Sequence, residues 1–428
     1  MDIDFDRKHI WHPYTSMLDP SPVYPVVSAE GCEIILEDGT RLIDGISSWW
    51  CVIHGYNHPE LNEALMAQIT SVSHVMFGGF THQPAITLAK KLLEIAPVGL
   101  NKVFFSDSGS VSVEVAIKMS IQFWQAQGKP EKKQLITIRG GYHGDTIGAM
   151  SVCDPISGMH SVFKGVVSEQ IFSERPKCGF EKSWNDNFIH DLEVKLERHH
   201  QDLAALILEP VAQCAGGMWF YAPLYLRRAK ELCEQYDILL IVDEVATGFG
   251  RTGKMFACEW AGITPDIMCV GKGLTGGYMS LAATLATDKV AIGVSTLMHG
   301  PTFMANPLAC SVAIKSVELL HKMDWQKKVF NIEKILRVGL SPLALNNAVK
   351  DVRFLGAIGV VETKEAIDVA LFQKKAVEMG VWLRPFGNLI YVMPAYVISE
   401  EQLKTIINVI GQLVCCQDIF KKTSKSFV

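Results

Sequence analysis

The stretch Pro265-Asp-Ile-Met-Cys-Val-Gly-Lys-Gly-Leu-Thr-Gly-Gly277 decides how the rest of the chain is interpreted. Its apolar run, residues 267–270, predicts a buried strand, and Lys272 follows directly between two glycines. A buried lysine ammonium without a partner is costly unless its pKa falls. Two interpretations stay open at this point. Lys272 is either a solvated residue at a strand end or an amine kept neutral to form a Schiff base with a carbonyl cofactor.

The composition excludes several classes of protein. Of the 428 residues, 49% are hydrophobic and 20% charged, which suits a large folded core. The net charge of −5 and the lack of a basic stripe argue against a nucleic-acid partner. The 11 cysteines include no Cys-x-x-Cys pair, which predicts reduced thiols. The acidic start, Met1-Asp-Ile-Asp-Phe-Asp6, is unlike a signal peptide, and no apolar run nears the ~18 residues of a membrane helix. We therefore expect a cytoplasmic protein without a membrane partner.

Predicted strands and helices alternate through the first three-quarters of the chain. The predicted strands cover residues 102–105, 134–138, 203–208, 238–242 and 267–270. The predicted helices cover residues 60–72, 84–95, about 110–126 and 223–236. Such alternation is typical of an α/β fold with a mostly parallel sheet and helices on both faces.

The pattern changes after about residue 310. Helices are predicted over residues 306–322, 365–379 and 400–414, with strands over 360–363 and 389–393. Residues 31–39, which alternate and end in Asp38-Gly39, predict a hairpin. We expect a large domain over residues 51–310, a small α+β domain over 311–428, and an N-terminal segment, 1–50, that joins the small domain. Residues 156–190 and the tail after Lys421 give no clear pattern.

Chemically active side chains gather at predicted strand ends, where ligands bind in such folds. These residues are Ser110, Tyr142, Glu209, Asp243 and Lys272. The small polar run Ser106-Asp-Ser-Gly-Ser110 precedes a helix, which fits either an anion site at free backbone amides or an ordinary N-cap. Arg139-Gly-Gly-Tyr-His-Gly-Asp145 fits either a close approach to a flat ligand over Tyr142 or a plain loop.

Two other features invite a functional interpretation. Gly248-Phe-Gly-Arg-Thr-Gly253 fits G-x-G-x-x-G and, with Lys254, G-x-x-x-x-G-K. The second motif needs Ser or Thr where Met255 stands, and the first needs an immediate helix that the pattern does not predict. His54 and His58 suggest a metal pair, but no third ligand is placed, so we expect no metal site.

Asp243-Glu-Val-Ala-Thr-Gly-Phe-Gly-Arg-Thr-Gly253, followed by Pro265-Asp266 and Gly271-Lys272, resembles the signature of the class III aminotransferases. Lys272 lies 29 residues after Asp243 (272 − 243), a spacing that suits the family. Further stretches resemble the members of the family that act in biotin synthesis. These are Trp11-His-Pro-Tyr14, Ser47-Ser-Trp-Trp50, His74-Val-Met-Phe-Gly-Gly79, Asp107-Ser-Gly-Ser110, Gly141-Tyr-His-Gly-Asp145, His299-Gly-Pro-Thr302 and Arg384-Pro-Phe-Gly387. The resemblance spans residues 5 to 415 and implies a fold-type I enzyme with a seven-stranded, mostly parallel sheet.

The resemblance implies pyridoxal phosphate as cofactor and a role for each matching residue. Lys272 would bind the cofactor covalently and then act as general base. Asp243 would pair with the pyridine nitrogen, and Tyr142 would stack on the ring. Gly109 and Ser110 would hold the phosphate. Gly300, Pro301 and Thr302 would come from a second subunit, with Thr302 on the phosphate, so the resemblance also implies a homodimer that shares its sites.

The resemblance extends to the substrates. Arg384 would grip the carboxylate of 7-keto-8-aminopelargonate, and Trp49 and Tyr14 would line the pocket. Of the adjacent pair Trp49-Trp50, one ring is expected in the core and the other at a cleft or interface. We expect S-adenosyl-methionine as the amino donor, with lysine as the alternative. Three other hypotheses stay open: a class III enzyme for ornithine, 4-aminobutyrate or glutamate semialdehyde, a nucleotide-binding module at Gly248, and a scaffold without catalysis.

Overall fold

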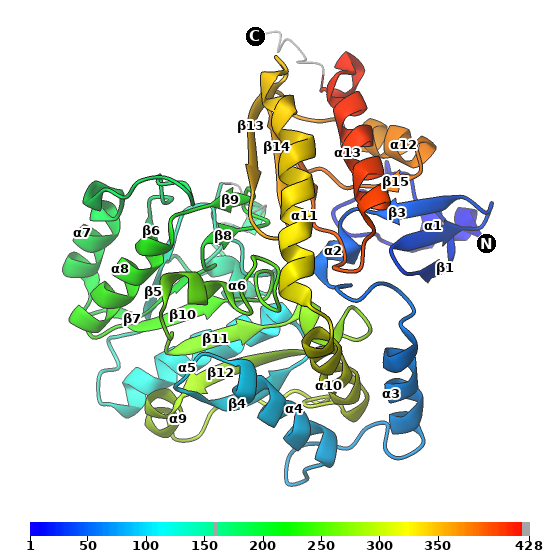
Figure 1. Ribbon diagram of the computed structural model, residues 1–428. Helices are drawn as coiled ribbons and strands as arrows, with labels where there is room; N and C mark the ends of the chain where they lie inside the picture. The colour runs from blue at the N-terminus through cyan, green and yellow to red at the C-terminus, as the bar shows by residue number, and fades with distance from the viewer. Residues whose placement is uncertain (157–160, 164, 422–428) are drawn as a thin grey trace. The chain divides into compact units, whose positions relative to one another are not determined.

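The computed structural model describes residues 1–156, 161–163 and 165–421 (Figure 1). Contacts divide the chain into two compact units. Unit 1 is Met1–His58 with Phe330–Val428, and unit 2 is Pro59–Val329. The expected boundary near residue 310 lies inside helix α10 (Pro307–Lys322), and the units divide instead within helix α11 (Trp325–Leu340). The tail after Lys421 lies outside the described residues.

Unit 2 is built on a seven-stranded sheet. In spatial order its strands are β4 (Leu100–Ser106), β12 (Ala282–Thr287), β11 (Ile267–Val270), β10 (Leu239–Asp243), β7 (Leu203–Leu208), β5 (Gln134–Ile138) and β6 (Ile171–Ser173). β12 runs antiparallel to both neighbours, and the other pairings are parallel. The predicted mostly parallel sheet is therefore confirmed.

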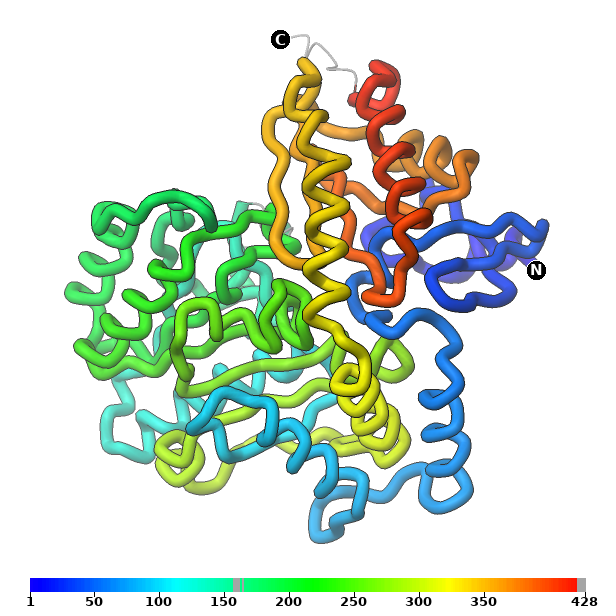
Figure 2. The backbone as a smooth tube through the Cα atoms, viewed as in Figure 1, coloured from blue at the N-terminus to red at the C-terminus, as the bar shows by residue number. Residues whose placement is uncertain are grey.

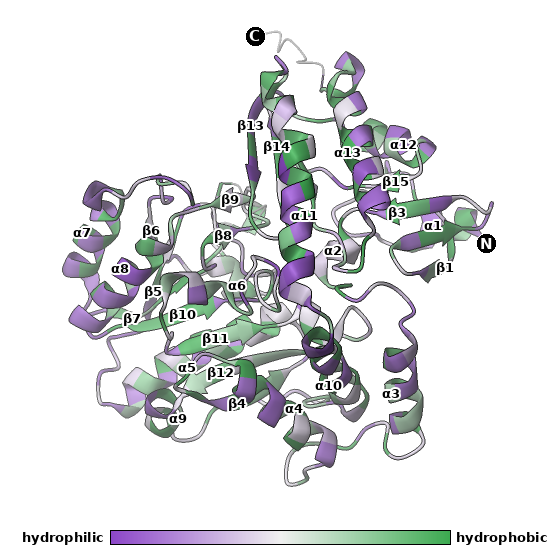
Figure 3. Ribbon diagram, viewed as in Figure 1, coloured by the Kyte–Doolittle hydropathy of each residue, from purple (hydrophilic) through white to green (hydrophobic). Residues whose placement is uncertain are grey.

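The central strands of this sheet are apolar along their whole length. Every residue of β7, β10 and β11 is buried, and Figure 3 shows β10 and β11 mainly in the colour of hydrophobic residues. Strands covered on both faces need such continuous apolar runs. The packing explains why residues 203–208, 238–242 and 267–270 were correctly predicted as strands.

Helices pack around the sheet of unit 2. They are α3 (Pro59–Ile69), α4 (Gln83–Ile95), α5 (Gly109–Ala126), α6 (Ile147–Ser151), α7 (His190–His199), α8 (Pro223–Gln235), α9 (Asp288–Val294) and α10. α5 packs on β11 and β12, whereas α7 and α8 lie side by side (Figure 1). Helix α5 begins shortly after β4 ends, so its first turn lies at that end of the sheet.

Unit 1 joins the two ends of the chain. Its first sheet has the order β1 (Val26–Glu30), β2 (Glu33–Leu36), β3 (Arg41–Asp44), β15 (Val381–Trp382), and its second the order β13 (Val349–Phe354), β14 (Gly359–Thr363), β16 (Leu389–Val392). Helices α1 (Ile3–His9), α12 (Val369–Glu378) and α13 (Glu400–Val414) complete it. β15 pairs with β3, so early and late segments lie side by side, blue beside orange in Figure 2. The predicted hairpin is confirmed as the antiparallel pair β2 and β3.

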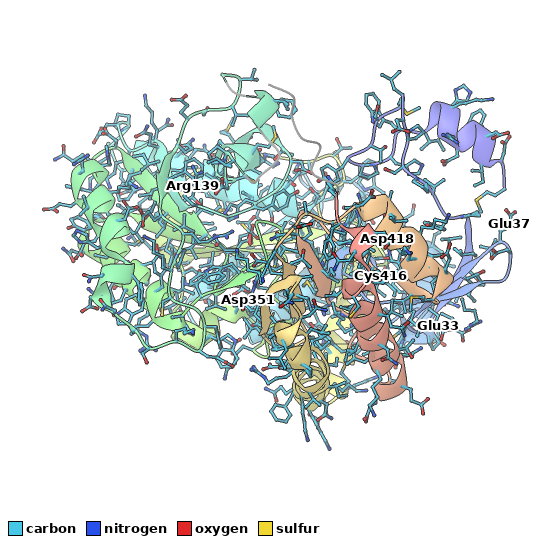
Figure 4. The ribbon with its side chains drawn as sticks, turned by 90° about the horizontal axis from the view of Figure 1, so that it is seen from above. Glu33, Glu37, Arg139, Asp351, Cys416 and Asp418 are labelled. Carbon is cyan, nitrogen blue, oxygen red and sulfur yellow. The ribbon has the colours of Figure 1, made fainter. Side chains whose placement is uncertain are left out.

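The cysteines are all free, and most are buried. Cys415 is the exposed one, and Cys416, labelled in Figure 4, follows it at the end of α13. No helix in the described ranges has both the length and the apolar character that crossing a bilayer requires.

Candidate active site

Lys272 stands at the carboxyl end of β11, beside the end of β10. Asp243, the last residue of β10, pairs with Cys269 on β11, and Lys272 follows three residues later (272 − 269). The backbone of Lys272 has φ 46°, in the left-handed region. That conformation costs a residue with a side chain about 1–2 kcal/mol and is retained mainly where the surroundings impose it, often at functional sites. The structure thus holds this lysine in an unfavourable conformation at the strand end.

Asp243 is a buried carboxylate with specific partners. It is 4% exposed, and its Oδ2 lies 2.8 Å from Nδ1 of His143, while its Oδ1 accepts the Val245 N–H at 3.0 Å. Nε2 of His143 is buried and has no hydrogen-bond partner. Such an orphaned ring nitrogen is unusual in a folded interior and marks a polar region prepared for something more than packing.

The surroundings of Cys214 show which charges meet at this point. Burial raises the pKa of the Cys214 thiol well above its ordinary range, and the negative charge of Glu209 raises it further. The positive charges of Lys272 and Arg251 act on the same pKa in the opposite direction. We use the name strand-end cluster for five residues: His143, Glu209, Cys214, Asp243 and Lys272.

The first turn of α5 lies next to this cluster. Ser108 caps the helix by accepting the Val111 N–H at 3.3 Å. A Cβ at Gly109 would stand 2.7 Å from Cγ1 of Val245, so only glycine fits there without a shift. The amides of a first helical turn have no partner within the helix and attract anions. The N-cap interpretation is therefore confirmed at Ser108, and the phosphate site at Gly109 and Ser110 stays a prediction.

Tyr142 lies on the loop that follows β5. Its N–H donates to Oε1 of Glu209 at 3.1 Å, and its hydroxyl donates to Asp145 at 2.9 Å. The amide of Asp145 in turn donates to Oγ of Ser110 at 3.2 Å. The loop therefore joins Tyr142, Ser110 and the strand-end cluster within unit 2.

In unit 1 the structure brings together Tyr14, Trp49 and Arg384, which we call the aromatic cluster. The rings of Tyr14 and Trp49 meet edge to face with centroids 6.4 Å apart. The guanidinium carbon of Arg384 lies 5.0 Å from the centroid of Trp49, a cation–π distance. Tyr14 is 57% and Trp49 40% exposed, whereas Trp50 is only 7% exposed. One ring of the pair is therefore in the core, as predicted, and the place of Trp49 at a cleft or interface stays a prediction.

A strained turn presents Trp49. Ser47, Ser48, Trp49 and Trp50, drawn as α2 (Ser47–Trp50), all have positive φ, from 44° to 77°. Four such residues in a row cost several kcal/mol by the steric penalty of left-handed backbone.

Asp44 offsets that strain. The buried carboxylate accepts the N–H groups of Ile46 and Ser48, each at 2.8 Å, and the hydroxyl of Tyr56 at 2.6 Å. Burial raises the pKa of Asp44, and these hydrogen bonds oppose that shift.

Gly300, Pro301 and Thr302, which are expected to come from a second subunit, belong to neither cluster. Gly300 and Thr302 are exposed on the loop between α9 and α10, and Pro301 is half-buried between them. A Cβ on Gly300 would meet no atom within 4 Å.

The Gly248 loop is not built to hold phosphate. Its amides are used internally: Gly248 N–H donates to Glu244 O, Gly250 N–H to Met255 O and Gly253 N–H to Gly250 O, at 2.9, 3.2 and 2.9 Å. The buried Glu244 carboxylate accepts the amides of Ala257 and Cys258 and so closes the loop. A phosphate-binding loop needs its amides free, so this loop has a structural role.

His54 and His58 pack edge to face with ring centroids 6.3 Å apart. Within the part of the chain that the structure describes, no group of three or more His, Cys, Asp or Glu side chains is placed to hold a metal ion.

Two residues of the site were not singled out from the sequence: His143, which contacts Asp243, and Asp44, which anchors the turn at Trp49. Glu209 was noted at a strand end but given no role. For His143 the signal was its place next to Tyr142 in a glycine-flanked run at a strand end. The signal for Asp44 was weaker, since only its place before a run of small and aromatic residues distinguishes it.

Comparisons with known proteins agree on one family. The family model for class-III aminotransferases matches residues 15–414. The chain is 51% identical to the adenosylmethionine-8-amino-7-oxononanoate aminotransferase of Buchnera aphidicola subsp. Baizongia pistaciae, over 98% of this chain and 99% of that one.

Solved structures give the same result. The crystal structure of adenosylmethionine-8-amino-7-oxononanoate aminotransferase from Methanocaldococcus jannaschii has a TM-score of 0.89 at 33% identity, over 96% of this chain and 98% of that one. A PLP-bound amine transaminase from an uncultivated Pseudomonas species has a TM-score of 0.86 at 29% identity, over 94% and 98% of the two chains. The chain therefore belongs to the class III aminotransferases, pyridoxal-phosphate-dependent enzymes of fold type I.

Proposed function

We propose that this chain is the transaminase that moves the amino group of S-adenosyl-L-methionine to 7-keto-8-aminopelargonate (8-amino-7-oxononanoate) and so forms 7,8-diaminopelargonate for biotin. The observation that carries the proposal is the 51% identity along nearly the whole of both chains to a relative named for this donor and acceptor. A relative from Saccharomyces cerevisiae with the same name is 45% identical over 96% of this chain. Distant organisms thus share both the name and the full-length match.

The residues of unit 2 fit pyridoxal phosphate. A buried carboxylate, Asp243, suits a protonated ring nitrogen, because opposite charges lower the cost of burying each other. The first turn of α5, at Gly109 and Ser110, suits the phosphate, and the phenol of Tyr142 suits the ring face. The orphaned Nε2 of His143, in contact with Asp243 through its other nitrogen, supports a site that is polar by design.

When bound, this cofactor supplies an electrophilic carbonyl and an electron-accepting ring. The chain supplies proton transfer and orientation. Lys272 holds the cofactor through its amine and is the base that takes the proton from the carbon bearing the donor's amino group. The same amine returns a proton to the acceptor's keto carbon in the second half of the cycle. Asp243 would favour the proton on the ring nitrogen, and His143, 2.8 Å from Oδ2 of Asp243, would fix the orientation of the Asp243 carboxylate.

Arg384 and the aromatic cluster select the acceptor. A planar guanidinium binds a carboxylate through two parallel hydrogen bonds, which suits the acid end of 7-keto-8-aminopelargonate. Trp49 supports Arg384 through its ring face, and Tyr14 packs against Trp49. We assign unit 2 to cofactor binding and unit 1 to acceptor recognition, in line with the expected large and small domains.

The proposal includes a homodimer. Gly300, Pro301 and Thr302 lie on a loop whose neighbouring large side chains are solvent-exposed in a single chain, among them Met298 at 70% and Phe303 at 55%. A second copy that covers them would bring Thr302 to its phosphate. The proposal also includes a cytoplasmic location, which suits a chain with free cysteines.

Amination assays with purified protein test this function. We expect turnover of 7-keto-8-aminopelargonate with S-adenosyl-L-methionine as donor and little turnover when lysine replaces that donor. We also expect little turnover of ornithine, 4-aminobutyrate or glutamate semialdehyde. Turnover with lysine instead would correct the donor alone. A preference for another acceptor would overturn the assignment while leaving the family intact. Wild-type protein without any turnover, together with no loss of its biological function in Lys272→Ala, would favour the hypothesis of a scaffold without catalysis.

A further inference from the structure

Glu209 is a buried carboxyl that the proposed mechanism does not use. It follows the last residue of β7 and is 3% exposed. Its two oxygens have different partners: Oε1 accepts the N–H of Tyr142 at 3.1 Å, and Oε2 accepts the N–H of Cys214 at 2.8 Å. Its main-chain carbonyl accepts the hydroxyl of Tyr221 at 2.6 Å. One carboxylate therefore joins the loop after β5 to the chain after β7.

The loop after β5 is held along its length, and the contacts next to Tyr142 include the N–H of His143 donated to Sγ of Cys153 and the carbonyl of Gly141, which accepts the N–H of Asp154. Asp154 accepts the N–H of Gly140 near the loop's start, and Ser110 accepts the N–H of Asp145 near its end. Glu209 acts between them, on the amide of Tyr142 itself. A displacement at this amide moves the ring of Tyr142, because a single methylene joins the ring to that backbone.

We propose that Glu209 is a positioning residue of the cofactor site, which fixes the backbone of Tyr142 and thereby the placement of the Tyr142 ring against the cofactor. The inference rests on the cofactor site of the proposed function but not on the identity of the acceptor. The strength of the contact depends on charge, since an ionised carboxylate accepts two amide hydrogen bonds better than a neutral acid does.

The local electrostatics place this change of charge near neutrality. Burial raises the pKa of Glu209, the neighbouring His143 lowers it and Asp243 raises it, and the two amides lower it, with a result of about 7. Glu209 also acts on the pKa of Cys153, Cys214 and Tyr221, each of which burial raises far above the neutral range. The titratable groups that face Glu209 are thus His143, Cys153, Cys214, Tyr221 and Asp243.

Three variants of the full chain test the role. Glu209→Gln imitates the neutral acid at every pH. Glu209→Asp keeps the charge but is one methylene too short to reach both amides. Glu244→Gln is the matched control, because Glu244 is also fully buried at a strand end with a pKa raised to about 7 by burial, yet it holds the amides of Ala257 and Cys258 in the Gly248 loop.

The first measurement is the affinity for pyridoxal phosphate, followed by visible absorbance between about pH 6 and pH 8, on either side of the Glu209 pKa. Near pH 6 we expect wild type and Glu209→Gln to bind alike. Near pH 8 we expect the variant to bind more weakly, on the order of tenfold, since a charge-assisted contact is missing. The ratio of Glu244→Gln to wild type should stay constant across the range. The titration of the cofactor itself cancels in these ratios.

The second measurement is the visible circular dichroism of the bound cofactor, which reports how the ring is held. We expect Glu209→Asp to lose much of this signal while keeping far-ultraviolet circular dichroism like that of wild type. Wild-type affinity of Glu209→Gln near pH 8 would overturn the inference, as would an unchanged visible signal in Glu209→Asp. The second result decides the matter even if Glu209→Gln does not fold. Because neither readout involves the acceptor, a failure of the amination assay would reject the proposed function and leave this test standing.

Discussion

The strand-end cluster in unit 2 and the aromatic cluster in unit 1 are built by opposite means. Asp243 and Lys272 come from adjacent strands of one sheet, and Asp243 is almost fully buried. Trp49, by contrast, is presented by a left-handed turn and is 40% exposed. Tyr14 is 57% exposed. Regular strands give a fixed, dry setting, which suits the proton transfer that we propose for Lys272. A strained turn with exposed rings gives a surface whose shape depends on a few side-chain contacts, which suits recognition.

Lys272→Ala tests the strand-end cluster most directly. Removing the amine removes both the covalent attachment of the cofactor and the base, so we expect turnover to fall by about 10⁴-fold or more. The matched control is Lys254→Ala, whose amine lies over Trp260 at 5.2 Å in the same unit and should retain activity. Steady-state rates with circular dichroism as a check on folding measure the effect. If Lys272→Ala kept more than about a hundredth of wild-type turnover, another residue would have to carry out the proton transfer.

Asp243→Asn keeps the size of the side chain and removes its charge. We expect kcat to fall by about 10²–10³-fold, because the ring nitrogen loses the anion that favours its proton. His143 keeps a hydrogen-bonding neighbour, so folding should change little. The measurement is kcat together with the absorbance of the bound cofactor. An unchanged kcat would show that the charge of Asp243 serves only His143.

Arg384→Lys tests the aromatic cluster. A lysine cannot bind a carboxylate through a planar fork or stack as well on Trp49, so we expect the KM for 7-keto-8-aminopelargonate to rise about 10- to 100-fold. The affinity for pyridoxal phosphate should not change. Arg353→Lys is the control, because Arg353 in the same unit is paired with Asp351 and Glu362. Equal effects of the two variants on KM would refute a specific role for Arg384.

Asp44→Asn weakens the anchor of the left-handed turn. Only one oxygen can then accept, so the N–H of Ile46 or of Ser48 loses its partner. We expect a loss of about 1–3 kcal/mol in the free energy of unfolding and a several-fold rise in the KM of the acceptor. Denaturant unfolding and initial rates measure the two effects. A loss of cofactor affinity in place of the KM effect would mean that the turn serves the strand-end cluster instead.

The stability of the fold also depends on pH, through the buried carboxyl of Glu244 in unit 2. Burial raises the pKa of Glu244 from 4.5 to about 7. Between these values the unfolded chain has lost the proton and the folded chain keeps it, so stability falls as pH rises, by about 3 kcal/mol in all.

Glu244→Gln removes this contribution. The difference in unfolding free energy between wild type and variant should fall from about pH 4.5 to about pH 7 and then level off, with turnover unaffected. Unfolding by denaturant at several pH values measures it. A difference that is flat across the range would show that Glu244 ionises normally in the fold.

The contrast between the clusters also explains what the sequence predicted. Asp243 and Lys272 follow continuous apolar runs, and such runs determine both the strand and its end, so these positions follow from pattern. The matching motifs then indicated the chemistry. β12 was not predicted, and its antiparallel direction depends on the course of residues 271–281 after β11, which no local pattern records. Helix α11 was missed as well, although its residues continue a helical pattern beyond α10.

In unit 1 the local pattern was a poorer guide. The size of the rings predicts that one tryptophan of Trp49-Trp50 faces outward. It does not predict the turn that presents this tryptophan. No propensity favours four left-handed residues without glycine, and the hydrogen bonds of Asp44 that hold them appear only once the chain has folded. The contact of Arg384 with Trp49 joins residues 335 positions apart (384 − 49) and was not predicted; the motifs of the family implied only that each residue meets the substrate.

The pairing of β3 with β15 has a consequence for biosynthesis. Ile43 finds its partner in Val381, 338 residues later (381 − 43), so the first sheet of unit 1 stays unfinished until nearly the entire polypeptide has left the ribosome. Every strand of the seven-stranded sheet, in contrast, is present once residue 287 has emerged. The seven-stranded sheet of unit 2 can therefore form during synthesis before the first sheet of unit 1 is complete.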